Sequence, residues 1–81
     1  MRVFFDGIEW DEHNLDHACR RVTAAEIEQV ITNANSYHSH QRYPDRVLFT
    51  DRTDGGKRVT VVARYDTGRR LVRPITAWEE S

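Results

Sequence analysis

Residues 45–65, DRVLFTDRTDGGKRVTVVARY, decide the fold expected for this chain. Apolar side chains recur at every second position on both sides of the turn signal TDGGK, which predicts two β-strands joined by a hairpin turn. The apolar face of this predicted hairpin consists of Val47, Phe49, Val59, Val61, Ala63 and Tyr65. The opposite face carries Arg46, Arg52, Arg58 and Arg64. Adjacent strands lie less than about 5 Å apart, so we expect these arginines to converge on one phosphate.

Another strand is expected at residues 69–76, RRLVRPIT, after a second turn at DTG. Pro74 has no backbone N–H to donate to a neighbouring strand, so this strand lies at a sheet edge or is bulged at that residue. Residues 3–5, VFF, are β-prone and predict an initial strand. The polar stretch of residues 36–44 predicts a loop.

Two helices are expected before the hairpin. Asp11 is the candidate N-cap of the first helix, and Trp10 and Leu15 have the spacing of a hydrophobic staple. Its predicted apolar stripe is Leu15, Ala18, Cys19 and Val22. Thr23 and Glu26 have the spacing of a capping box for the second helix. The buried stripe predicted for that helix is Ile27, Val30, Ile31 and Ala34. The order β-α-α-β-β-β predicts an α+β domain in which two N-terminal helices pack on one face of a small antiparallel meander sheet.

Length and composition are those of one small globular domain over residues 1–81. The chain has 38% hydrophobic and 31% charged residues, and a core of this size is marginal, so a partner or a second copy of the chain would add stability. We expect no membrane span and no signal peptide, because no sufficiently long apolar run exists. Cys19 is the only cysteine, which excludes an intramolecular disulfide framework and favours the cytoplasm.

Charge is distributed unevenly along the chain. Residues 1–35 carry a net charge of −4, whereas residues 42–73 carry +5, almost entirely from arginine. Arginine suits bidentate contact with phosphate. The asymmetry is consistent with a polyanion-binding half and equally with a solvated arginine-rich face.

His13 and His17 are four residues apart on the first predicted helix. This spacing suits a solvent-facing pair, an RNA-facing pair with an acid–base role near neutral pH, or two ligands of a metal. No glutamate follows His13 directly and no third ligand is evident, so we predict neither a metal site nor a cofactor.

Three segments together resemble the BrnT family of toxins. They are WDEHNLDHACRRVTAAEIEQVI at residues 10–31, the hairpin at residues 45–65, and RRLVRPITAW at residues 69–78. In the last segment the arginine, the short apolar pair and the Thr-Ala step resemble the closing strand of the family. The family usually has arginine where Trp78 stands, and it commonly continues into a basic C-terminal helix where this sequence stops at Ser81. Both differences remove positive charge from the expected RNA side.

The resemblance implies a toxin of a type II toxin–antitoxin pair, with a RelE-like fold and metal-independent endoribonuclease activity. Its partners would be an RNA substrate and a DNA-binding antitoxin encoded beside it. In such a reaction the neighbouring 2′-OH attacks the phosphate, arginines stabilise the charge on the phosphorane, and a histidine transfers protons. We expect the catalytic residues to be His17, Arg46, Arg52 and Arg73. We expect the substrate-binding residues to be Arg58, Arg64 and Arg70.

Two other functions are compatible with the same residues. One is a non-catalytic RNA- or protein-binding domain of the same fold. The other is a metal-binding regulator that uses the helix histidines. Cleavage of RNA by the purified protein distinguishes the first from a nuclease, and elemental analysis of untagged protein tests the second.

Overall fold

The chain forms two helices and a five-stranded mixed sheet. The computed structural model describes residues 5–34, 37–40 and 42–80. The elements in chain order are β1 (Gly7–Ile8), α1 (Glu12–Ala18), α2 (Ala24–Asn33), β2 (His38–Ser39), β3 (Arg46–Arg52), β4 (Arg58–Asp66) and β5 (Leu71–Glu79). The strand order across the sheet is β1-β5-β4-β3-β2. The α+β class is therefore confirmed.

The predicted sheet is correct at its centre and wrong at both edges. Strands β3, β4 and β5 form the expected antiparallel meander. β1, however, pairs with the start of β5 in the parallel direction, so the sheet is mixed. Residues 36–44, predicted to be a loop, contain the short strand β2, which pairs with β3. The initial strand expected at residues 3–5 falls largely outside the described residues, and the observed β1 begins at Gly7.

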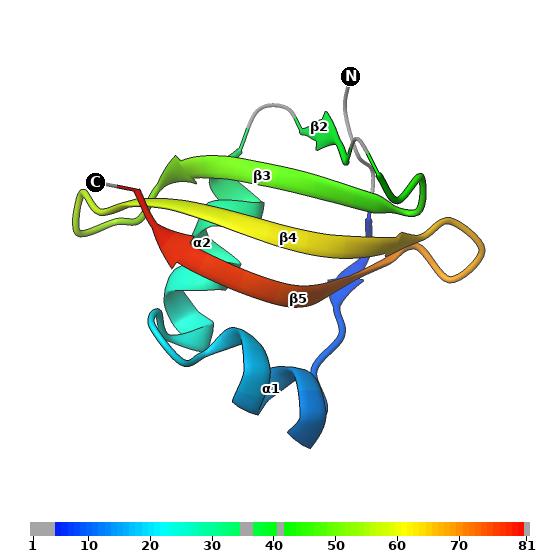
Figure 1. Ribbon diagram of the computed structural model, residues 1–81, viewed down its shortest axis with the longest axis horizontal. Coiled ribbons are helices and arrows are strands. Elements are labelled where there is room, and N and C mark those ends of the chain that lie inside the picture. The colour runs from blue at the N-terminus through cyan, green and yellow to red at the C-terminus, as the bar shows by residue number, and fades with distance from the viewer. Residues whose placement is uncertain (1–4, 35–36, 41, 81) are drawn as a thin grey trace.

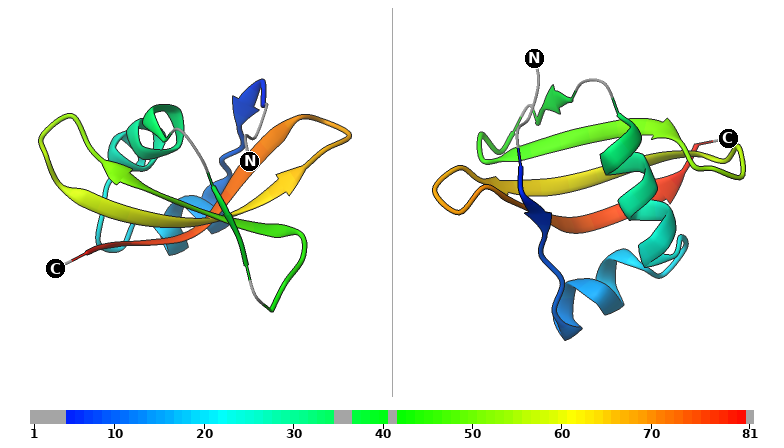
Figure 2. Two further views of the ribbon diagram at one scale, coloured as in Figure 1. Left: turned by 90° about the horizontal axis from the view of Figure 1, so that it is seen from above. Right: turned by 180° about the vertical axis from the view of Figure 1, so that it is seen from behind.

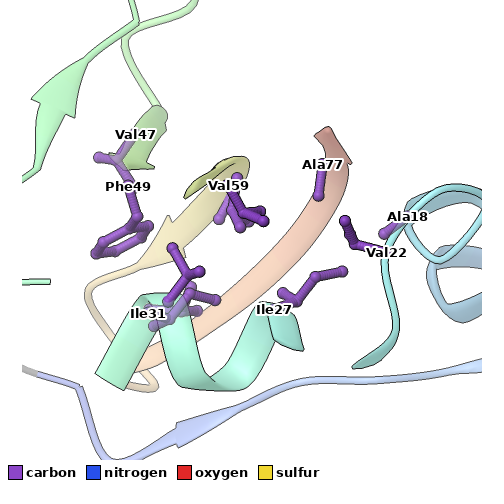
Figure 3. Close-up of a cluster of buried hydrophobic side chains, with 12 residues drawn as sticks. Ala18, Val22, Ile27, Ile31, Val47, Phe49, Val59 and Ala77 are labelled. Atoms are coloured by element: carbon purple, nitrogen blue, oxygen red, sulfur yellow. The ribbon is translucent and has the colours of Figure 1, made fainter. Parts of the chain in front are cut away.

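Helix α2 lies across one face of the sheet and leaves the other face without a helix (Figures 1 and 2). The capping box of Thr23 and Glu26 is present, and the apolar residues of α2 pack onto the strands as predicted. Figure 3 shows this core between α2, β3, β4 and β5. Its central members, with no more than 3% of their surface exposed, include Ile27, Val30, Ile31, Phe49, Val59, Val61, Ala63 and Val72. Strands β3 and β4 therefore present their apolar side to α2 and their arginines to the uncovered face.

Helix α1 does not cover the sheet as predicted but lies beyond the edge of β5 (Figure 1). Leu15, expected in a buried stripe, is 42% exposed, whereas Asn14 and Ala18 are buried. The indole N–H of Trp10 donates to Glu28 on α2 over 2.9 Å. The helix therefore buries a narrow side against β5, and its polar side remains beside the uncovered face of the sheet. Within the described part of the chain, neither helix is long and apolar enough to cross a membrane.

Candidate anion-binding site

Three arginines form one row across the uncovered face of the sheet. The strand register sets Arg46 of β3 opposite Arg64 of β4, and Arg64 opposite Arg73 of β5. Directly opposed residues have Cβ atoms about 5 Å apart, and like charges in these positions destabilise a sheet. A row of three guanidinium groups is therefore unfavourable unless anions lie beside it.

A β-bulge brings Arg73 into this row. Val62 lies opposite Thr76 and Ala63 lies opposite Pro74, so β5 contains one extra residue, Ile75. In a regular ladder Pro74 would lie opposite Arg64, and Arg73 would point to the core, because side chains alternate between faces. The missing N–H of Pro74 makes a break in pairing inexpensive at this point. The sequence predicted either a sheet edge or a bulge at Pro74, and the structure shows a bulge.

The arginine row and the histidines of α1 line the same surface hollow. This hollow has a volume of about 220 Å³, and its walls are His13, Asn14, His17, Asp45, Arg46, Arg64, Arg73, Pro74 and Ile75. Both histidines have exposed side chains. The two imidazoles and the three guanidinium groups therefore face the same space. The interpretation of the histidines as an RNA-facing pair requires this arrangement. No group of three or more His, Cys, Asp or Glu side chains among the described residues is arranged to hold a metal.

Asn14 fixes α1 at the wall of this hollow. Its side-chain oxygen accepts from the backbone N–H of Asp11 over 2.7 Å, completing a capping box in which Asp11 accepts from the backbone N–H of Asn14. Its amide nitrogen donates to the carbonyl oxygens of Glu9 and Pro74, both over 3.0 Å. The bond to Pro74 ties α1 to β5 at the bulge and so holds the helix histidines beside Arg73.

Carboxylates and an aromatic ring hold the three arginines in place. Arg73 is 28% exposed and lies 2.8 Å from a carboxylate oxygen of Asp11 and 3.7 Å from one of Glu9. The hydrogen bond that the Arg73 guanidinium donates to the Asp11 carboxylate lowers the pKa of Asp11 from 3.8 to about 2 and raises the pKa of Arg73. Arg64 lies 3.2 Å from Asp45. The Arg46 guanidinium carbon lies 4.2 Å from the centre of the Tyr43 ring, a cation–π contact.

The other three predicted arginines lie elsewhere. Arg52 and Arg58 face each other at the opposite end of the β3–β4 hairpin, roughly 20 Å along β3 from Arg46 at about 3.3 Å per residue. Arg52 also donates to the carbonyl of Gly56 in the hairpin turn over 3.1 Å. Arg70 has a positive φ of 56° in the β4–β5 turn, and its guanidinium lies 3.2 Å from Asp6. The arginines predicted to converge on one phosphate therefore form two separate groups.

The sequence did not reveal the side chains that hold the arginine row in place or the one that holds helix α1 against β5. Asp45 and Tyr43 gave no signal, because a loop residue beside a strand can point in any direction. Asn14 gave a weak signal, since an amide three residues after the N-cap Asp11 has the spacing of a capping box. No family model, curated protein or solved structure matches the chain.

Proposed function

We propose that this domain is a metal-independent endoribonuclease and acts as the growth-arresting toxin of a type II toxin–antitoxin pair. The observation that carries the proposal is the row of Arg46, Arg64 and Arg73 in one hollow with His17. The row is unfavourable by itself, and its guanidinium groups are already in contact with carboxylates at two of three positions. A phosphodiester can replace those carboxylates as the counter-anion, because arginine binds both groups in the same bidentate manner.

The hollow supplies the groups that RNA cleavage requires. The 2′-oxygen attacks the adjacent phosphorus and loses its proton, the bond from phosphorus to the 5′-oxygen breaks, and the leaving oxygen gains a proton. The products are a 2′,3′-cyclic phosphate and a free 5′-hydroxyl. The arginine row stabilises the extra negative charge on the phosphorane. His17 is assigned the proton transfers, with His13 as the neighbouring second imidazole in the hollow.

A cleavage assay on purified protein tests the proposal. We expect the protein to cut total RNA without added metal, and the Arg64→Gln and Arg73→Gln variants to cut on the order of 100-fold more slowly. Lys57→Gln is the matched control, because Lys57 pairs with Glu26 at 2.8 Å and does not line the hollow. Binding of RNA without cleavage would favour the non-catalytic alternative. If the protein neither binds nor cleaves RNA, the nuclease proposal and the RNA-binding alternative are both contradicted.

The antitoxin is part of the same proposal. A DNA-binding protein encoded beside this gene would neutralise the toxin, and the small core of this domain makes a stabilising partner or second copy advantageous. Co-expression with the product of a neighbouring reading frame should abolish growth arrest. Growth arrest that no neighbouring product relieves would argue against the toxin–antitoxin assignment, even if RNA is cut.

A further inference from the structure

A second hollow continues from the arginine row along β5. It has a volume of about 250 Å³, and its walls are His17, Arg20, Arg21, Thr76, Ala77 and Trp78. His17 lines both hollows, so they meet at this side chain. A single strand that enters the first hollow therefore has a path into the second.

The walls of the second hollow combine two cations with one aromatic ring. Arg20 and Arg21 lie between α1 and α2, and both are exposed. The guanidinium of Arg20 is 3.9 Å from Asp16, a loose contact between side chains that are 67% and 82% exposed. Arg21 makes no ion pair with any carboxylate that the structure describes. These two cations are therefore freer to meet an anion than Arg64 and Arg73 are.

Trp78 forms the facing wall from the uncovered side of the sheet. It lies opposite Thr60 in the strand register, on the same face as Arg64 and Arg73. Its indole N–H donates to a carboxylate oxygen of Glu80 over 3.2 Å, so the polar atom of the ring is already satisfied. A ligand would therefore contact Trp78 through its aromatic surface, as in base stacking, rather than by a hydrogen bond to the indole.

We propose that the second hollow is a nucleotide subsite, in which the base stacks on Trp78 and the phosphate contacts Arg20 and Arg21. This inference rests on the proposed function, since it requires the scissile phosphate of an RNA strand to occupy the arginine row. Proteins that hold single strands combine a basic groove for the backbone with aromatic rings for the bases. Stacking on one ring tolerates any base, so the subsite adds affinity with little sequence preference.

Binding of 2′-O-methyl RNA, which lacks the nucleophilic hydroxyl, separates the two hollows. We would measure dissociation constants by fluorescence anisotropy for a dinucleotide, a hexanucleotide, and hexanucleotides with one abasic position. Trp78→Leu should weaken hexanucleotide binding about tenfold and leave dinucleotide binding unchanged, whereas Arg73→Gln should weaken both. Trp78→Phe should retain most of the affinity, and Lys57→Gln should retain all of it.

The abasic series provides a second, independent readout. One abasic position should reduce the affinity of the wild-type protein about tenfold. The same abasic position should not weaken binding to Trp78→Leu any further, because the missing base and the Trp78 ring are the two partners of one stacking contact. If Trp78→Leu does not fold, Arg21→Gln and the abasic series on the wild-type protein still decide the question. Loss of affinity in Arg73→Gln alone, with no abasic effect, would overturn the subsite and leave the proposed function intact. Failure of the wild-type protein to bind any oligonucleotide would overturn both.

Discussion

Replacing Asn14 with alanine should detach α1 from the sheet. The side chain is 97% buried and makes three hydrogen bonds to the backbone, at Asp11, Glu9 and Pro74. At about 1 kcal/mol for each bond, the free energy of unfolding should fall by about 3 kcal/mol. The total for a chain of this length is roughly 8 kcal/mol, so the loss should lower the melting temperature by about 15 °C.

The assay is urea unfolding followed by tryptophan fluorescence and circular dichroism. Asn33→Ala is the matched control, because Asn33 is exposed and makes a single long bond of 3.4 Å to Asp54. It should change the free energy of unfolding by less than about 0.5 kcal/mol. RNA cleavage by the folded fraction of Asn14→Ala should also fall, since α1 carries His13 and His17. A loss of stability equal to that of the control would refute the conclusion that Asn14 holds α1 against β5.

Three further substitutions test single contacts. Asp11→Asn keeps an N-cap acceptor but removes the nearer of the two carboxylates beside Arg73, so phosphate should bind several-fold more tightly by calorimetry. Unchanged affinity would count against this competition. In the folded protein the pKa of Asp11 is about 2, below its ordinary value of 3.8, so the charged carboxylate stabilises the fold above about pH 4. This stabilisation is lost as the pH falls to about 2, and the difference in melting temperature between wild type and Asp11→Asn should disappear over the same range. Thr23→Ala should cost about 1 kcal/mol in urea unfolding, through loss of the α2 cap. Leu15→Lys should stay within about 0.5 kcal/mol of wild type, and a larger loss would show that Leu15 is buried in solution.

Local periodicity made the sheet centre and α2 predictable. The alternation in β3 and β4 and the stripe of Ile27, Val30 and Ile31 depend on residues close in sequence, and both appear in the structure as expected. The separation of Arg52 from Arg46 could also have been predicted. A turn at residues 53–57 sets Arg52 opposite Arg58 and Arg46 opposite Arg64, at opposite ends of the hairpin.

The remaining features depend on contacts between distant parts of the chain. Whether Arg73 faces the core or the hollow depends on one extra residue in the pairing of β5 with β4. Pro74 indicates an edge or a bulge, but no local pattern distinguishes these two or specifies which face Arg73 takes. The position of α1 depends on a hydrogen bond from Asn14 to Pro74, sixty residues away. Of the predicted apolar stripe of this helix, Ala18 and Val22 are buried as expected, whereas Leu15 is exposed and the polar Asn14 is buried in contact with β5.

An NMR titration of the arginine side chains tests directly whether phosphate binds in the hollow beside α1. The Nε–Hε signals of the protein would be followed while a 2′-deoxy dinucleotide, which cannot be cleaved, is added. We predict that the signals of Arg46, Arg64 and Arg73 shift together with one dissociation constant, and that those of Arg52 and Arg58 remain in place. Shifts spread equally over both arginine groups, or confined to Arg52 and Arg58, would contradict a phosphate site in the hollow beside α1.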